Sequence, residues 1–410
     1  MQATDPRRAV EAVWRIESAR LIAGLARLVQ DVGLAEELAQ DALVIALEQW
    51  PQTGVPPNPG GWLMSTAKHR AIDQLRRRTR YQEKLAEIGR SQETAAPEDE
   101  ERHDIEDDLL RLIFTACHPV LSTEGRVALT LRLLGGLRTD EIARGLLVPE
   151  PTVAQRISRA KRTLTTRNVA FALPSPPELA ERLASVLEVV YLIFNEGYTA
   201  TAGDGWMRPE LCAEALRLGR LLAGLAPREP EVHGLVALME IQASRLRART
   251  GPDGEPVLLP DQDRRRWDRL LIRRGLDALA RAEELGGTLG PYALQAAIAA
   301  CHARARTPDD TDWPRIATLY RVYGELFPAP VAELNRAVAV GMADGPAAGL
   351  AVVDALAATG ALDTYPQLPA VRGDLLDRLG RRDEARAEFT RAASLTRNAR
   401  ERQLFTERAQ

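Results

Sequence analysis

Side chains suited to nucleic-acid binding recur at helical spacing between residues 152 and 162. Arginine and glutamine can each make paired hydrogen bonds with one base edge in the major groove. Four side chains are placed for such contacts: Thr152, Gln155, Arg156 and Arg159. Lys161 and Arg162 lie nearer the end of the segment and are predicted to bind backbone phosphates. The pattern fits a DNA-binding helix face, and it equally fits the solvated face of an ordinary helical hairpin.

A helix-turn-helix at residues 137–164 would hold these side chains in position. In its first helix, Ile142 and Leu146 belong to an apolar stripe at helical spacing. Pro149 prevents that helix from continuing, and Pro151 suits the first turn of the second helix, where a missing N–H costs little. The second helix has an apolar face opposite the cations: Val153, Ile157, Ala160 and Leu164. One face is therefore expected in a core and the other at a DNA surface.

The composition favours helices along the whole chain. Of the 410 residues, 45% are hydrophobic and only 5% are aromatic, and Ala, Leu and Arg, all strong helix formers, are abundant. The fold class is therefore predicted to be all-α. The net charge of −3 conceals basic blocks at residues 68–80 and 156–167, with an acidic stretch at 93–108 between them. Local patches of this kind, rather than the net charge, determine where a polyanion binds.

The cysteines indicate neither disulfides nor a metal. Cys117, Cys212 and Cys301 are too few and too scattered for a disulfide framework, which favours a reducing cytoplasm. Cys117 and Cys301 each precede a histidine, but neighbouring helical side chains point about 100° apart. We therefore predict buried thiols, no metal site and no cofactor. No signal-peptide pattern occurs, and no apolar run approaches the roughly 20 residues of a membrane span, so a cytoplasmic protein without membrane contact is expected.

Near the C-terminus, small and large apolar residues recur with the spacing of a tetratricopeptide helix pair. In such a pair, small residues let two helices pack closely. The residues that follow this spacing are Gly373, Leu376, Gly380, Ala385, Phe389 and Ala392. A weaker echo precedes them by about 36 residues, close to the period of such repeats. A stack of helical hairpins is therefore expected, and an irregular helical bundle is the alternative.

Three segments resemble, in the same order, parts of bacterial alternative sigma factors of the extracytoplasmic-function (ECF) type. Residues 35–47 (AEELAQDALVIAL) resemble the sigma region 2 helix that binds the clamp of core RNA polymerase, and residues 60–80 resemble the adjoining helix that helps to melt the −10 element. Residues 135–164 resemble sigma region 4, whose helix-turn-helix recognises the −35 element. Longer strings resemble the subgroup with a tetratricopeptide-like C-terminal extension: Asp107–Leu121, Val189–Leu218 and Leu368–Arg381.

The resemblance implies four parts of the chain. They are a region 2 helical bundle at residues 8–80, an acidic linker at 81–106, region 4 at 107–167, and a tetratricopeptide-like regulatory domain at 178–410. Such a sigma factor would bind the clamp and flap of core RNA polymerase, recognise both promoter elements and initiate transcription. Polymerase performs the chemistry, so no catalytic residue and no enzymatic activity are expected. We also expect the C-terminal domain to contact the sigma regions within the chain and to control access to polymerase.

Eleven side chains of the N-terminal region receive roles from the resemblance. Four on the 35–47 helix are assigned to the polymerase interface, with a plain solvated helix face as the alternative: Glu36, Glu37, Gln40 and Asp41. Seven are assigned to the −10 element: Asn58, Trp62, Lys68, His69, Arg76, Arg77 and Arg80. Asn58 would contact a flipped base and Trp62 would stack on it, unless Trp62 only anchors its helix in the core. The proline- and glycine-rich segment 51–61 around Asn58 is expected to form neither helix nor central strand.

Two positions depart from the family pattern. His69 stands where many relatives carry asparagine, which blurs the promoter specificity expected of this chain. Ala116 stands where close relatives often carry a second cysteine, which argues further against a metal.

Other functions account for parts of the sequence. A transcriptional activator with a helix-turn-helix and a tetratricopeptide sensor would explain residues 137–164 and the repeats, but not the region 2 motif. Binding to core RNA polymerase separates this activator from a sigma factor. An enzyme is the least supported alternative, because the sequence contains no phosphate loop, metal set or nucleophile constellation.

Overall fold

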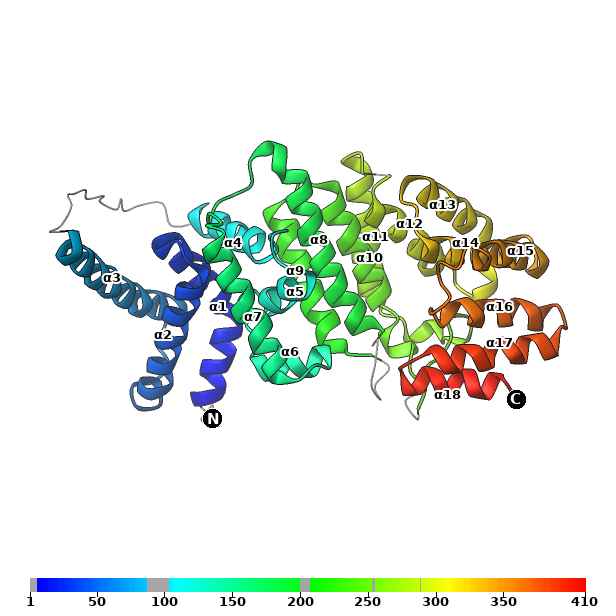
Figure 1. Ribbon diagram of the computed structural model, residues 1–410, viewed down its shortest axis with the longest axis horizontal. Coiled ribbons are helices and arrows are strands. Elements are labelled where there is room, and N and C mark those ends of the chain that lie inside the picture. Colours follow the sequence, from blue (N-terminus) through cyan, green and yellow to red (C-terminus); the bar gives the residue numbers. More distant parts are fainter. Residues whose placement is uncertain (1–5, 87–102, 200–206, 253–254, 288) are drawn as a thin grey trace. The chain divides into compact units, whose positions relative to one another are not determined.

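The computed structural model describes residues 6–86, 103–199, 207–252, 255–287 and 289–410. Within these residues, the side chains of 6–9, 11, 75, 77–86 and 103–106 are outside the description. The described chain forms eighteen α-helices and four short 3-10 helices, and it contains one isolated β-bridge but no strand (Figure 1). The prediction of an all-α fold is confirmed. The chain divides into two compact units, residues 1–190 and 191–410.

Unit 1 is built from seven helices and the first part of an eighth. They are α1 (Pro6–Val29), α2 (Val32–Thr53), α3 (Pro59–Ala86), α4 (His103–Ala116), α5 (Thr123–Leu133), α6 (Thr139–Leu146), α7 (Glu150–Thr166) and α8 (Pro176–Tyr198). Helix α1 packs against α2, α3 and α4, while α5 packs against α6 and α7. The buried carboxylate of Asp108 joins α4 to α1, because it pairs with Arg27 of α1 at 3.1 Å. It also pairs with Arg111 of α4 at 2.7 Å.

The helices around the proline- and glycine-rich segment are longer than predicted. Helix α2 continues through Pro51 to Thr53, and α3 already begins at Pro59, so the prediction for residues 51–61 is wrong at both ends. Proline is compatible with both places: in the last exposed turn of α2 it removes one hydrogen bond, and at the start of α3 its missing N–H would have no helical partner. Gly54, with a φ of 82°, terminates α2 in a conformation that favours glycine.

The acidic stretch is also partly helical. Helix α3 extends to Ala86 and α4 begins at His103, so both helices enter the range 81–106 that the sequence assigned to a linker. Charged residues such as Glu and Lys are good helix formers, and they can continue a helix without an apolar stripe. The remaining predicted linker, residues 87–102, lies outside the described residues.

Unit 2 contains the end of α8 and ten further helices, which pack mainly against their neighbours in sequence. These helices are α9 (Pro209–Leu225), α10 (Pro230–Ala243), α11 (Arg269–Glu284), α12 (Pro291–Arg304), α13 (Trp313–Leu326), α14 (Pro330–Ala343), α15 (Pro346–Ala357), α16 (Gln367–Arg378), α17 (Arg382–Leu395) and α18 (Ala399–Arg408). In Figure 1, α16, α17 and α18 lie side by side at the C-terminal end, as their contacts require.

The predicted repeat is a helix pair. A Cβ at Gly373 of α16 would lie 3.0 Å from the ring of Phe389 on α17, so the small residue allows the two helices to pack closely. Gly380, with a φ of 77°, forms the turn between them. The weaker echo is a second close pair, since a Cβ at Gly349 of α15 would meet the Cα of Gly341 on α14 at 2.7 Å. The C-terminal domain is therefore a stack of helical hairpins, as predicted.

Candidate nucleic-acid interface

Helix α7 begins and packs as its sequence predicts. Pro149 precedes it and Pro151 occupies its first turn, while α6 ends at Leu147 in a left-handed conformation with a φ of 49°. The predicted apolar face is buried: Val153, Ile157, Ala160 and Leu164. This face lies against α5, where the Cβ of Ala160 is 3.7 Å from the place a Cβ would take on Gly125. The two helices α6 and α7 form the helix-turn-helix that the spacing indicated.

The opposite face of α7 carries cations without carboxylate partners. Gln155, Arg159 and Arg162 are exposed, and Thr152 and Arg156 are half-buried beside them. Among the ion pairs of the described residues, none involves Arg156, Arg159 or Arg162. Their guanidinium groups are therefore available to base edges and phosphates. Lys161 differs, because its Nζ lies 2.5 Å from the carboxylate of Glu36 on α2.

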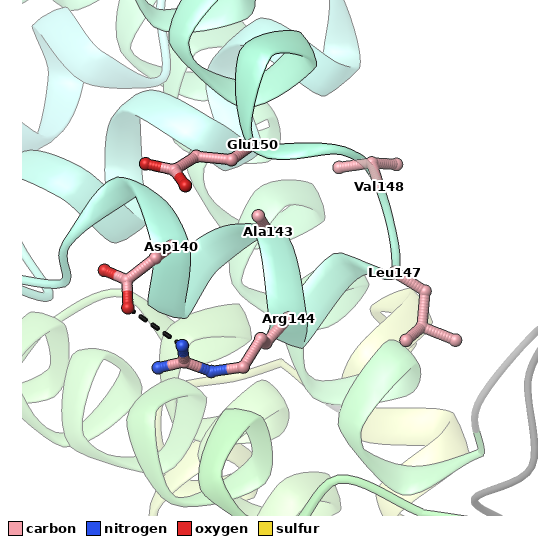
Figure 2. Close-up of a pocket in the computed structure, with 6 residues that line it drawn as sticks. All are labelled: Asp140, Ala143, Arg144, Leu147, Val148 and Glu150. Atoms are coloured by element: carbon pink, nitrogen blue, oxygen red, sulfur yellow. Dashed lines mark hydrogen bonds and ion pairs between the residues drawn. The ribbon is translucent and has the colours of Figure 1, made fainter.

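A shallow hollow of about 410 Å³ lies at the turn between α6 and α7 (Figure 2). It is lined by Asp140, Ala143, Arg144, Leu147, Val148 and Glu150. Arg144 donates a 2.8 Å hydrogen bond to Asp140, so the charges on this side compensate each other. Leu147 is 49% exposed and offers an apolar contact at the rim. The hollow suits contact with a protein segment better than contact with DNA, because its one lining cation is already paired with Asp140 and the carboxylate of Glu150 would repel phosphates.

The start of α3 brings two of the predicted −10 residues together. The side chain of Asn58 accepts a 2.9 Å hydrogen bond from the backbone N–H of Gly61, which is the geometry of an N-terminal cap. Trp62 is half-buried, and its ring packs in an edge-to-face arrangement with the buried Trp50 ring. The ring centroids are 5.4 Å apart and the angle between the ring planes is 66°. Asn58 therefore has its amide N–H groups left for other partners, and Trp62 keeps part of its ring accessible.

Farther along α3, the described cations face solvent. Lys68, His69 and Arg76 are exposed. Arg70 is also exposed and pairs with Asp41 of α2 at 2.6 Å, which joins the two helices. The side chains of the predicted DNA contacts Arg77 and Arg80 lie outside the described residues.

The four residues assigned to the polymerase interface differ in exposure. Glu37 and Asp41 are exposed, Gln40 is half-buried, and Glu36 is only 2% exposed. The carboxylate of Glu36 lies 2.6 Å from Arg132 Nε on α5 and 2.5 Å from Lys161 Nζ on α7. Local sequence patterns do not indicate this contact, because its partners lie on distant helices.

Models of known families match three parts of the chain. Residues 16–81 match "Sigma-70 region 2" and residues 111–164 match "Sigma-70, region 4". The ECF RNA polymerase sigma factor SigL of Mycobacterium tuberculosis is 29% identical over 139 residues, which are 34% of this chain and 76% of SigL. The chain is an ECF-type sigma factor with a C-terminal extension. Residues 182–283 of that extension match a family of unknown function (DUF6596).

A relative of this sigma factor shares almost its whole length. The uncharacterized protein R00370 of Rhizobium meliloti is 43% identical over 382 residues, which are 92% of this chain and 89% of R00370. The crystal structure of yeast Tom70 aligns with this chain at 12% sequence identity, over 98% of this chain and 87% of the Tom70 chain. The TM-score of 0.31 is too low to indicate a shared fold.

Two observations concern membrane and metal binding. None of the helices in the described ranges combines the length and the apolar character that crossing a membrane requires. Within the same ranges, no cluster of three or more His, Cys, Asp or Glu side chains is arranged to hold a metal ion. The three cysteines are buried, as predicted, and burial raises the pKa of Cys117 to about 11 and that of Cys212 to about 12.

The first part of α8 packs into region 4 of this sigma factor, a contact that the motifs did not indicate. Arg182 donates a 2.9 Å hydrogen bond to the carbonyl of Phe114, and Ser185 donates one of 2.6 Å to the carbonyl of Cys117. These carbonyls belong to the end of α4, where helical partners are missing. Arg126 of α5 donates to Ser185 and to Glu188. Side chains of the extension thus donate hydrogen bonds to the carbonyl groups at the C-terminal end of α4.

Proposed function

We propose that this sigma factor binds core RNA polymerase and directs it to promoters by contacting the −35 and −10 elements, under the control of its own C-terminal domain. One observation carries the proposal. Two matched sigma regions, in the expected order, each present a helix with a buried apolar face and an exposed cationic face. An activator would need only the second of these helices.

The −35 element is assigned to α7. Gln155 and Arg159 are exposed one turn apart, so both can enter one major groove, and Thr152 and Arg156 flank them. Arg162 lies toward the end of the helix and is assigned to phosphate, which orients the helix without specifying sequence. Lys161 is assigned to phosphate as well, once it leaves Glu36.

The −10 element is assigned to α3 and to the residues before it. Lys68, His69 and Arg76 supply exposed cationic or polar groups along one helix, and their affinity for a separated strand should depend on salt. The side chain of Asn58 keeps its N–H donors for a base edge, and the accessible part of the Trp62 ring can stack on a base. The contact with Trp50 also holds the ring in place, so both roles predicted for Trp62 are compatible.

Polymerase contacts are assigned to two surfaces of unit 1. On α2, Glu37, Asp41 and Val44 follow one another at helical spacing and are exposed, with Val44 at 52%. An exposed apolar side chain beside carboxylates suits contact with a protein better than contact with DNA, because the carboxylates repel phosphates. This face is assigned to the polymerase clamp, and the hollow at Leu147 to the flap.

Control by the C-terminal domain is supported by α8. This helix contributes residues to both compact units, and its first part is hydrogen-bonded to α4 and α5. A change of unit 2 that bends or releases α8 would therefore act on the packing of region 4. The contact is within the chain, so no separate protein is needed for it.

Run-off transcription tests the proposal. Purified core polymerase should initiate from a cognate promoter only when this protein is added, whereas an activator would require another sigma factor. Deleting residues 191–410 removes unit 2 but keeps the part of α8 that packs on region 4, and it should change promoter-specific transcription. If core polymerase initiates nowhere with the full chain, the sigma function is contradicted. If the deletion leaves transcription unchanged in vitro and in cells, control by unit 2 is contradicted.

A further inference from the structure

Glu36 joins the N-terminal helices of unit 1 to the helix-turn-helix. Its carboxylate is buried between Arg132 of α5 and Lys161 of α7, at 2.6 and 2.5 Å, and it also accepts a hydrogen bond from Gln40. We call Glu36, Arg132 and Lys161 the Glu36 ion-pair cluster. A carboxylate withdrawn from water needs such partners, and removing one of them leaves an uncompensated buried charge. The cluster therefore favours the arrangement in which α2 and α7 are in contact.

Other contacts extend the same interface. Thr165 of α7 donates a 3.3 Å hydrogen bond to the carboxylate of Asp31, the residue that caps α2. A Cβ on Gly33 of α2 would lie 4.0 Å from the Cβ of Lys161, so the two backbones are close. Arg15 of α1 pairs with Glu141 of α6 at 3.1 Å. The helix-turn-helix is thus held against the N-terminal helices along its second helix and at one point of its first.

This arrangement is too compact to span a promoter. The −35 and −10 elements are centred about 25 base pairs apart, which corresponds to about 85 Å of duplex at about 3.4 Å per base pair. In the structure, Arg70 of α3 and Lys161 of α7 are both bound to side chains of α2, Asp41 and Glu36. Positions five residues apart on a helix are separated by about 7.5 Å along its axis. The two DNA-binding helices cannot reach both elements while these ion pairs hold.

We propose that the Glu36 ion-pair cluster is an autoinhibitory contact of the free protein, which opens when the sigma factor engages a promoter with polymerase. On opening, Lys161 exchanges the Glu36 carboxylate for a DNA phosphate. Lys161 is paired with an anion in both states. The equilibrium between the closed and the open protein therefore depends on the difference in free energy between these two ion pairs. The inference rests on the proposed sigma function, and it gives Glu36 an internal role in the free protein.

The first experiment measures DNA binding by the isolated full-length protein. Glu36→Gln keeps the size of the side chain and removes its charge, whereas Glu48→Gln makes the same change at an exposed position of α2. With a duplex from a promoter identified by run-off transcription, Glu36→Gln should raise the affinity by about tenfold, as expected for a modest coupling between two states. Glu48→Gln should leave the affinity unchanged. Equal affinities for Glu36→Gln and the wild type would overturn the proposal.

The second experiment locks the contact and does not depend on the folding of Glu36→Gln. The Cβ separation of 4.0 Å at Gly33 and Lys161 lies within the range of disulfides, about 3.5–4.5 Å. The double variant Gly33→Cys/Lys161→Cys should cross-link under oxidant and then lose the run-off transcription with core polymerase that the same variant shows after reduction. The reduced double variant is the reference, because it already lacks the phosphate contact assigned to Lys161. Each single variant should respond to neither treatment, since the native cysteines are buried.

The outcomes separate the two proposals. Full transcription by the cross-linked protein, or failure of the pair to cross-link, would overturn the autoinhibitory contact and leave the sigma function intact. Absence of transcription by the wild-type protein would contradict the sigma function itself.

Discussion

Arg126 and Ser185, 59 residues apart in the sequence, are joined by a 2.5 Å hydrogen bond in the buried contact between α5 and α8. Ser185 links this contact to α4, because its hydroxyl donates a hydrogen bond to the carbonyl of Cys117 at the end of that helix. Thr123 accepts a further hydrogen bond from Arg126, which places the start of α5 in the same network. The sigma regions and the extension therefore share a polar core at this point, in which each group depends on the others.

Ser185→Ala should destabilise region 4. The substitution leaves the Cys117 carbonyl and one N–H of Arg126 buried without this partner, at a cost of about 1–3 kcal/mol. Hydrogen exchange of the α4 and α5 amides in the full chain should become faster. Glu181→Ala, an exposed change on the same helix, should leave exchange as in the wild type. Equal exchange rates for the two variants would contradict the role of the hydroxyl.

Arg159→Ala and Arg162→Ala should weaken DNA binding in different ways. Arg159 is assigned to a base edge, so its loss should cost about 1–3 kcal/mol and relax specificity at one position of the −35 element. Arg162 is assigned to phosphate, so its loss should weaken all sequences similarly and lower the salt slope by about one. Titrations of polymerase holoenzyme on matched and single-base-substituted promoters, at several salt concentrations, distinguish them. Identical profiles would contradict the separation of roles.

Val44→Asp should weaken binding to core polymerase. Val44 is the exposed apolar residue on the α2 face assigned to the clamp, and a charge there would be desolvated in the complex, at a cost of at least roughly tenfold in affinity. Val120→Asp makes the same change at an exposed position between α4 and α5, and it should bind core polymerase normally. Fluorescence titration of labelled protein with core polymerase provides the measurement. Unchanged affinity for Val44→Asp would exclude this face.

The stability of unit 2 should fall as the solution is acidified. Burial, together with the charges of Arg245 and Arg264, lowers the pKa of His302 from 6.5 to about 3. Between these values the unfolded chain binds the proton and the folded chain does not, so stability is full above pH 6.5 and decreases as the pH falls toward 3. His302→Asn should lose less stability than the wild type between about pH 7 and about pH 4.5. Parallel losses in denaturant titrations of the two proteins would refute this assignment.

Two glycine substitutions should change stability in opposite directions. Gly349→Ala introduces a Cβ 2.7 Å from the Cα of Gly341, a backbone atom that cannot move without separating α14 from α15. The expected loss is about 1–3 kcal/mol, as for other overpacked cores. Gly324→Ala within α13 has open space around the new atom, and it should gain about 0.5–1 kcal/mol through helix propensity. Thermal denaturation of both variants tests the sign.

Much of the architecture follows from local patterns. The spacing of Val153, Ile157 and Leu164 predicts one buried face of α7, and Pro149 predicts the break before it; both predictions are confirmed. The helix pair around Gly373 and Phe389 is likewise confirmed. These features depend on residues a few positions apart, where helical geometry alone determines which side chains share a face.

The exposure of the polar residues on α2 could not be predicted from such local patterns. The sequence treats Glu36, Glu37, Gln40 and Asp41 as one polar group, and their role at the polymerase remains a prediction. Exposure separates them: Glu37 and Asp41 reach solvent, whereas Glu36 is buried. A carboxylate at the edge of an apolar stripe is compatible with either outcome, and the choice depends on what packs against it.

The sequence by itself therefore determined the all-α class, the helix-turn-helix, its cationic face and the resemblance to sigma factors, because each is encoded within short stretches of chain. Only the tertiary structure decided that Glu36 pairs with Arg132, 96 residues away, and that Ser185 completes the end of α4. Spacing along a helix carries no information about a partner on a distant helix. The contacts that close unit 1 depend on packing, which brings charges together and removes them from water.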